Sequence, residues 1–248
     1  MKFECIANAL NLRAEPRGTV LAELRFSDVF EVAASKANAE WVHGAVLSGV
    51  SIGKKGYVRR KWLIQRFDSP PAIAPLDRTE AARIIAKRTV EFDGIHYDLG
   101  SKAKTWKELK KNGYVDCSGW VYLLGKELIE GYQLTAAPSE LYTYSDEQII
   151  NCGSRTKTII SGRYLSEALF QPGVLVGIDF AEYSWDRGRP LDIDHIVVIG
   201  QDESGLFVSQ SSSNGAGVNK VPLSKWLSSQ ASLIKAGRVH LVDLLSMP

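Results

Sequence analysis

A short proline-rich segment divides the chain into two parts with different hydrophobic patterns. Residues 66–78 read RFDSPPAIAPLDR and hold three of the nine prolines, without helical or strand periodicity. Proline fixes the backbone angle φ and removes an amide donor, so such a segment is typical of a stiff connection between folded units. We therefore expect a first domain over residues 1–65, a linker over 66–78 and a second domain over 79–248.

The first 65 residues have the pattern of a small all-β domain. Short alternating or β-branched segments are separated by turns rich in Gly, Asn and Lys, a spacing that suits a small barrel. The segments are 10–16, 19–24, 28–34, 40–47 and 54–63. Their order, from LNLRAEP to the closing GYVRRKWL, resembles a bacterial SH3-like domain. The alternative is another small β-barrel, which would change little about function.

Helical patterns come first in the second domain, and strand patterns follow. Apolar residues recur at helical spacing over 79–90 and 117–129, with Thr79 as the expected N-cap of the first helix. A short helix is expected near 146–150. Strand candidates follow at 174–180, 195–201, 205–211 and 238–245. Helices followed by consecutive strands predict an α+β fold with helices packed on an antiparallel sheet.

Charge and cysteine content exclude several classes of function. The chain has 30 basic and 28 acidic residues, so it lacks the positive excess that nucleic acid or anionic membranes attract. No apolar window approaches the roughly 20 residues that span a bilayer. Three widely spaced cysteines fit neither a disulfide framework nor a zinc site, so we expect no metal and no cofactor. The N-terminus lacks a signal-peptide pattern, so we expect a cytoplasmic protein, unless a phage or export route delivers it to the cell wall.

The stretch GYVDCSGWVYLL, residues 113–124, places a cysteine at the predicted start of a helix. Asp116 can cap this helix, and Cys117 then faces the free N–H groups and the positive dipole end. That setting lowers the pKa of a thiol and can hold an oxyanion. The small Ser118 and Gly119 leave room for a substrate. The alternative is an ordinary buried thiol, the commoner role and the one expected for the other two cysteines.

The stretch DIDHIVVIG offers a candidate base. It places His195 at the start of a buried strand, where the imidazole could accept a proton from a thiol. Asp192 and Asp194 flank it and either raise its pKa as nearby charges or serve as turn residues. A lone histidine beside an apolar strand is more often a core residue, so spacing alone leaves a pair with Cys117 open.

Together these stretches resemble the NlpC/p60 family of papain-like cysteine peptidases. YVDCSGWV is followed by DHIVVIG and then by GLFVSQSSS, in the family's order of nucleophile, base and third polar residue. The resemblance covers essentially residues 79–248, and SH3-like domains often accompany this family. It implies a papain-like domain in which Cys117 is the nucleophile and His195 activates it and later protonates the leaving amine.

The resemblance leaves the third catalytic position open between two neighbours. Alignment of FVSQSSS with the family's FIHASS-like strand selects Ser209, and a shift of one residue selects Gln210. The two side chains face opposite sides of a strand, so only one can reach the imidazole. A serine hydroxyl orients a histidine less well than an amide does, because it is short and rotates freely.

The resemblance also implies a substrate: a peptidoglycan stem peptide with a free N-terminal L-alanine, cut between γ-D-glutamate and the diamino acid. Asp116 stands where a carboxylate would recognise the ammonium of that alanine, and it can cap the helix as well. Tyr97 aligns with a tyrosine that lines the site, its alternative being a half-buried packing residue. Ser118, next to the nucleophile, is the third residue expected at the substrate.

Two other functions remain open at this point. The chain could be a wall-peptide-binding protein whose peptidase domain has decayed, as a serine at position 209 would suggest. It could also be an amide hydrolase or acyltransferase on another γ-glutamyl-like substrate. The SH3-like domain either narrows the cleft or binds the cell wall, and the stiff linker favours the first. The sequence does not determine the oligomeric state or the diamino acid.

Overall fold

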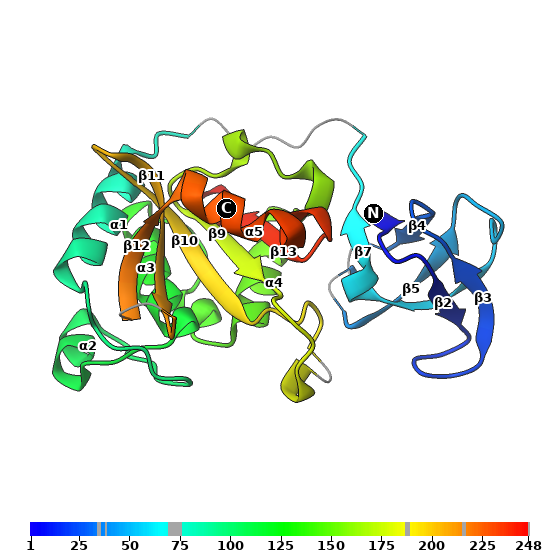
Figure 1. The fold of residues 1–248 in the computed structure, drawn as a ribbon, viewed down its shortest axis with the longest axis horizontal. Helices are drawn as coiled ribbons and strands as arrows, with labels where there is room; N and C mark the ends of the chain where they lie inside the picture. The colour runs from blue at the N-terminus through cyan, green and yellow to red at the C-terminus, as the bar shows by residue number, and fades with distance from the viewer. Residues whose placement is uncertain (34–35, 38, 69–75, 187–188, 215–216, 248) are drawn as a thin grey trace.

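The chain folds into two antiparallel sheets, one in each part, and helices cover only the C-terminal sheet (Figure 1). The computed structural model describes residues 1–33, 36–37, 39–68, 76–186, 189–214 and 217–247. The predicted α+β class, with an all-β N-terminal part and helices packed on an antiparallel sheet, is confirmed. Within the described ranges, no helix is both long and apolar enough to cross a bilayer.

The N-terminal sheet has seven strands in the order β3-β2-β6-β5-β4-β1-β7. The strands are β1 Lys2–Cys5, β2 Leu10–Arg13, β3 Val20–Leu24, β4 Val29–Val32, β5 Trp41–Val46, β6 Lys55–Arg59 and β7 Leu63–Gln65, with a 3-10 turn η2 at Arg60–Trp62. Their alternating apolar residues, such as Phe3, Leu12 and Phe30, form a core of their own. The sequence missed β1, which pairs with both β4 and β7. The SH3-like identity of this part stays a prediction.

The C-terminal sheet has six strands in the order β12-β11-β10-β9-β13-β8, and every described pair is antiparallel. The strands are β8 Ile160–Ser161, β9 Val174–Ile178, β10 His195–Asp202, β11 Gly205–Ser212, β12 Gly217–Pro222 and β13 Val239–Asp243. The helices are α1 Thr79–Glu91, α2 Trp106–Asn112, α3 Cys117–Gly131, α4 Ser145–Thr156 and α5 Leu223–Lys235. Short 3-10 turns are η3 Pro138–Leu141, η4 Gly162–Tyr164, η5 Glu167–Leu169, η6 Ser184–Asp186 and η7 Leu244–Ser246.

The two faces of this sheet bury separate hydrophobic cores. Successive side chains of a strand point to opposite faces, so the apolar run of β10 supplies both. Ile196 and Val198 belong to the core that α1, α3 and α4 cover, whereas Val197 and Ile199 belong to the core that α5 covers. Figure 1 shows α5 lying across its face of the sheet. The sheet is therefore a buried middle layer between helices.

Several expected boundaries differ from the observed ones. Thr79 is the first residue of α1 and not its N-cap; Arg78 occupies the cap position, and the Asp77 carboxylate accepts the Thr79 N–H at 2.9 Å. The short helix expected near 146–150 is the twelve-residue α4. Residues 69–75 of the expected linker lie outside the described residues, so the domain boundaries stay a prediction.

The two parts are in direct contact. The Lys61 ammonium of η2 lies 2.9 Å from the Asp192 carboxylate, which belongs to the segment before β10. The Ile159 N–H, just before β8, donates to Gln65 Oε1 of β7 at 3.3 Å. Arg163 of η4 also pairs with the buried Glu4 of β1. These contacts attach the N-terminal sheet to the segment before β10 and to the segments on either side of β8.

Candidate active site

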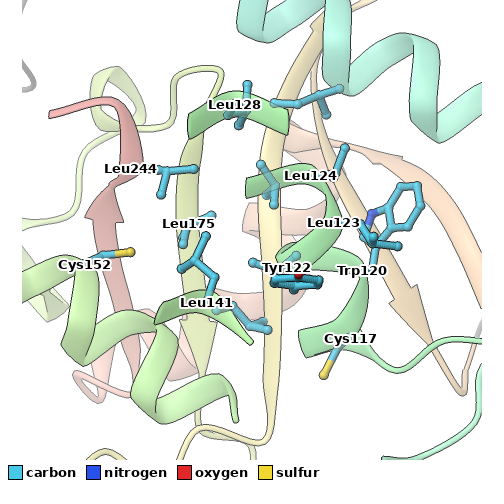
Figure 2. Packing of buried hydrophobic residues seen from close by; sticks show 14 of the residues in the cluster. Cys117, Trp120, Tyr122, Leu123, Leu124, Leu128, Leu141, Cys152, Leu175 and Leu244 are labelled. Carbon is cyan, nitrogen blue, oxygen red and sulfur yellow. The ribbon is translucent and has the colours of Figure 1, made fainter. Parts of the chain in front are cut away.

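Cys117 is the first residue of α3, as the sequence predicted. Asp116 is the N-cap, with φ −81° and ψ 175°, and its Oδ1 accepts the Gly119 N–H at 2.5 Å. Figure 2 shows the Cys117 side chain at the first turn of α3, with its sulfur directed away from the core residues that the same helix carries. Cys152 lies on α4 and is 1% exposed, in line with the expected role as a buried thiol.

The protonation state of Cys117 differs from the expectation. Burial, together with the Asp116 charge, raises the pKa of the thiol to about 11, although hydrogen bonding by the Ile196 backbone and the Lys102 charge act in the opposite direction. The expected lowering by the helix end is therefore outweighed by desolvation of a side chain that is only 6% exposed. At neutral pH the cysteine is a thiol, so it needs a base that removes its proton during attack.

His195 stands beside this thiol at the backbone level. It is the first residue of β10, and the hydrogen bond from the Ile196 backbone to the sulfur sets Cys117 against the peptide that follows His195. Burial lowers the pKa of the imidazole, and the hydrogen bond to Gln210 opposes that shift. A neutral imidazole is the form that can accept the thiol proton. The structure thus places the backbone at the start of β10, where the predicted base lies, next to the predicted nucleophile.

The two aspartates that flank His195 are held by other groups. The Asp194 carboxylate accepts the Phe180 N–H at 2.8 Å, and Asp192 pairs with Lys61. Neither carboxylate is a cause of the His195 pKa shift, which is downward. Of the two interpretations of these residues, the structure supports the one in which they order the turn before β10.

The side chain of β11 that contacts the imidazole is Gln210 and not Ser209. Gln210 Oε1 lies 2.9 Å from His195 Nε2. Ser209 is fully buried on the other face of β11, where its hydroxyl accepts the Trp120 indole N–H at 2.9 Å and contacts the Thr89 hydroxyl at 2.8 Å. Because neighbours on a strand face opposite sides, the sequence alternative that selected Ser209 is corrected. The serine is a core residue, so its presence does not suggest a decayed site.

Lys102, which the sequence did not single out, forms an ion pair with Asp116, the carboxylate expected to bind the substrate ammonium. Lys102 Nζ lies 3.3 Å from both Asp116 oxygens and also contacts the Ser118 hydroxyl, which donates to Asp116 Oδ1 at 3.0 Å. The Asp116 N–H donates to Ser101 O at 2.8 Å, which holds the lysine segment there. Asp116 and Ser118 therefore meet a cation of the chain itself, and a substrate ammonium would have to compete with it.

The small size of Gly119 serves internal packing. A Cβ at this position would lie 2.8 Å from Val115 Cγ2 and 2.9 Å from Ser101 O, distances that real Cβ atoms do not show. The expectation that Gly119 leaves room for a substrate is therefore wrong. The residue instead lets the segment around Ser101 approach the first turn of α3.

Tyr97 lies close enough to Cys117 for the two side chains to interact electrostatically, and its role at a substrate stays a prediction. Its segment pairs with the chain before α3, because the His96 N–H donates to Gly113 O at 3.1 Å and the Val115 N–H donates to His96 O at 3.0 Å. Burial, with smaller contributions from the charges of Cys117 and Asp116, raises the pKa of the phenol to about 12. The half-buried tyrosine is thus a neutral hydroxyl donor within electrostatic reach of the thiol.

Helix α4 connects the cysteine and histidine segments, a role that the sequence did not reveal. The fully buried Gln148 donates from Nε2 to Ser118 O at 2.8 Å, and Asp146 Oδ1 accepts the Ile193 N–H at 2.8 Å. The only available signal was the cluster SDEQ at the start of this helix.

A second contact that was not predicted is made by Phe180, whose ring lies 6.0 Å from the His195 ring at an interplanar angle of 21°.

The chemistry available to these groups is acyl transfer to sulfur. A thiol at a helix start, a neutral imidazole and an amide that orients the imidazole are the parts of a cysteine nucleophile with its base. Among the described residues, no group of three or more His, Cys, Asp or Glu side chains is arranged to hold a metal ion.

No family model and no curated protein matches this chain, whereas several solved structures do. NlpC2 from Trichomonas vaginalis is 12% identical with a TM-score of 0.36, over 90% of this chain and 68% of that one. An NlpC/P60 family protein from Bacillus cereus is 13% identical with a TM-score of 0.37, over 98% and 63%. An NlpC/P60 endopeptidase from Photobacterium damselae subsp. piscicida is 12% identical with a TM-score of 0.39, over 100% and 54%. This chain thus spans between 54% and 68% of their lengths.

Proposed function

We propose that the chain is a cysteine peptidase of the NlpC/p60 type. The observation that carries the proposal is the joint placement of Cys117 at the start of α3, His195 at the start of β10 and Gln210 on the imidazole. The sequence motifs around these three residues, in their order along the chain, support the same function.

In the proposed reaction the sulfur of Cys117 attacks the carbonyl carbon of a scissile amide while His195 takes the thiol proton. Because both groups are neutral at rest, proton removal accompanies attack. The Gly119 N–H already donates to Asp116 and is therefore not free to hold the oxyanion. We propose that the backbone N–H groups nearest the sulfur hold it instead. His195 then gives the proton to the leaving amine, and water hydrolyses the thioester to a free carboxylate and the thiol.

The proposed substrate is a peptidoglycan stem peptide, cut between γ-D-glutamate and the diamino acid. The expected requirement for a free N-terminal L-alanine is revised, because Lys102 already neutralises the Asp116 carboxylate. A substrate ammonium would gain little from a carboxylate with a cation at 3.3 Å, and it would meet repulsion from that cation. We therefore propose that a peptide whose alanine amine is blocked, as it is when linked to a sugar, is cut at least as well as the free peptide.

Mass spectrometry of two peptides tests the proposal. L-Ala-γ-D-Glu-diaminopimelate and its N-acetyl form are incubated with the wild type, with Cys117→Ala and with Cys152→Ala. We expect the wild type and Cys152→Ala to release the dipeptide from both forms, and Cys117→Ala to release none. A preference for the free peptide of tenfold or more would overturn the revised substrate and leave the peptidase in place.

The remaining outcomes decide between the proposed peptidase and its alternatives. If neither peptide is cut and iodoacetamide labels Cys117 no faster than Cys152, the peptidase is wrong and a wall-peptide-binding protein is the better proposal. If neither is cut but Cys117 is labelled at least tenfold faster, an amide hydrolase or acyltransferase on another substrate replaces it. Labelling is measured by peptide mass spectrometry at neutral pH, so it does not depend on the substrate.

A further inference from the structure

Three side chains on neighbouring strands form a continuous row of hydrogen bonds that starts at the candidate base. His195 Nε2 of β10 lies 2.9 Å from Gln210 Oε1 of β11, and Gln210 Nε2 donates to Asn219 Oδ1 of β12 at 3.2 Å. Asn219 Nδ2 donates to Gly217 O at 2.7 Å. Gln210 and Asn219 are direct partners in the β11–β12 register. The row therefore follows the sheet from the imidazole to a backbone carbonyl.

The final carbonyl fixes the direction of every bond in the row. A backbone carbonyl can only accept, so Asn219 must turn its NH₂ group to Gly217 O and its Oδ1 to Gln210. Gln210 must then donate through Nε2 and present Oε1 to the imidazole. An oxygen acceptor requires a proton on His195 Nε2. In the neutral ring Nδ1 then carries the lone pair, and in the proposed reaction this is the atom that accepts the thiol proton.

The carbonyl at the end of the row is held by tight packing. Gly217 has φ +84°, and a Cβ there would lie 1.8 Å from Ile95 O, so only glycine fits. The next residue, Val218, bonds the same segment in both directions: its N–H donates to Ile95 O at 2.8 Å, and its carbonyl accepts the Gly94 N–H at 3.0 Å. This segment leads directly into Tyr97. The polarity of the row is thus anchored in backbone that cannot rotate freely.

We propose that Asn219 is a positioning residue, which selects the Nε2–H tautomer of His195 by fixing the amide of Gln210. Without Asn219, the Gln210 amide can rotate by 180° and offer its NH₂ group to Nε2. The ring would then carry its proton on Nδ1 and could not accept one from the thiol. The consequence for catalysis rests on the proposed function, whereas the tautomer is a property of the folded chain.

Nitrogen-15 NMR of histidine-labelled protein above pH 7 tests the inference without any substrate. The His195 signals are assigned by comparison with His195→Gln. We expect the Nε2–H tautomer in the wild type and a shift of about tenfold in the tautomer ratio towards Nδ1–H in Asn219→Leu, the effect of losing one oriented hydrogen bond. Asn219→Asp keeps an acceptor for Gln210 Nε2 and should keep the wild-type ratio. Gln201→Leu, at an exposed amide on β10, is the matched control and should change nothing.

A second pair of variants keeps the test valid if Asn219→Leu perturbs the strand. In Gln210→Glu the side chain can only accept when ionised, so it holds Nε2–H with or without Asn219. The double variant Gln210→Glu with Asn219→Leu should therefore recover the wild-type tautomer. Iodoacetamide alkylation of Cys117, in which the sulfur displaces iodide and His195 takes the thiol proton, should slow about tenfold in Asn219→Leu and recover in Asn219→Asp.

Two results would overturn the inference: an Nδ1–H tautomer in the wild type, or an unchanged tautomer ratio in Asn219→Leu that folds normally. These results are distinguishable from a failure of the proposed function. A wild type that cuts no peptide but whose tautomer responds to Asn219 refutes the peptidase and retains the positioning role. If the wild type cuts the peptide but Asn219→Leu leaves the tautomer ratio unchanged, the positioning role is refuted and the peptidase is retained.

Discussion

Cys117 and His195 both lose most of their contact with water, and burial disfavours the charged form of each. Desolvation raises the pKa of Cys117 and lowers that of His195, so the resting pair is a thiol and a neutral imidazole. Gln210 acts against burial, because its Oε1 accepts a hydrogen bond from the ring and stabilises the imidazolium. The pKa of His195 is therefore set by two opposing effects: burial lowers it, and the hydrogen bond to Gln210 raises it.

The activity of the wild type should fall as the pH drops through the lowered His195 pKa, because only the neutral imidazole accepts the thiol proton. We expect the acid limb of kcat/KM to lie below pH 6.5, the ordinary histidine value. Gln210→Leu removes the interaction that raises the pKa, so its acid limb should move to still lower pH while its plateau activity falls. Rates on the stem peptide between pH 4 and 8 measure both.

Ser209→Ala is the matched control for this profile, since it changes the neighbouring residue on the opposite face of β11. It leaves the Trp120 indole N–H without its acceptor and should lower the free energy of unfolding by about 1–3 kcal/mol, with the acid limb unmoved. An acid limb that moves in Ser209→Ala and stays fixed in Gln210→Leu would contradict the assignment of the third residue.

The helices and strands that could be predicted from the sequence are those that local residue patterns determine. Helix α3 and its Asp116 cap were predictable because an N-cap carboxylate and apolar spacing are both present within one stretch. The choice between Ser209 and Gln210 was not, because it depends on which face of β11 meets His195. That face is set by the register that opposes Val198 to Ser209, a property of two strands and not of one.

Contacts between distant segments were equally hidden from the sequence. Lys102 reaches Asp116 only because the segment around Ser101 pairs with the chain before α3. The raised pKa of Cys117 follows from burial, which no local pattern reports. Helix α5 was not predicted, although its apolar residues Leu223 and Trp226 are buried. The reason is that many of its other side chains are short and polar, in particular its serines. Tertiary packing thus supplied what local propensity left undetermined.

Helix α4 should influence activity through the segment that ends at His195. The buried Asp146 accepts the Arg189 Nε–H at 2.6 Å and the Ile193 N–H at 2.8 Å. Asp146→Ala leaves the Arg189 Nε–H and the Ile193 N–H without their acceptor, so we expect a loss of about 3 kcal/mol in the free energy of unfolding and a lower kcat. Chemical denaturation and steady-state kinetics measure the two effects.

Asp202→Ala is the control for Asp146→Ala, because Asp202 lies at the opposite end of β10 from His195. Its carboxylate pairs with Lys220 at 2.7 Å on the surface, where ion pairs contribute about 1 kcal/mol or less. We expect near-normal kcat and stability in this variant. Equal losses of kcat in the two variants would mean that any disturbance of β10 lowers activity and that Asp146 has no particular role.

At the scale of the whole molecule, the N-terminal sheet reaches the segment that carries the candidate base. Lys61, on η2 between β6 and β7, lies 2.9 Å from Asp192 and 3.1 Å from Glu182. Asp192 is only 1% exposed, so this lysine is the counter-charge of a carboxylate that water barely reaches. The contact links two parts of the chain that have separate hydrophobic cores. An ion pair of this kind can align one part with the other.

Lys61→Met should therefore impair a site to which it contributes no reacting atom. The variant leaves Asp192 buried without its cation, a change that costs about 3–5 kcal/mol when a buried pair is broken, and the turn before His195 should shift to hydrate the carboxylate. We expect a several-fold loss of kcat and a lower unfolding midpoint. Adding Asp192→Asn removes the uncompensated charge and should recover much of both losses. Lys2→Met, which breaks the exposed pair with Asp68, should leave kcat unchanged. A normal kcat in Lys61→Met would mean that the N-terminal sheet does not align the base.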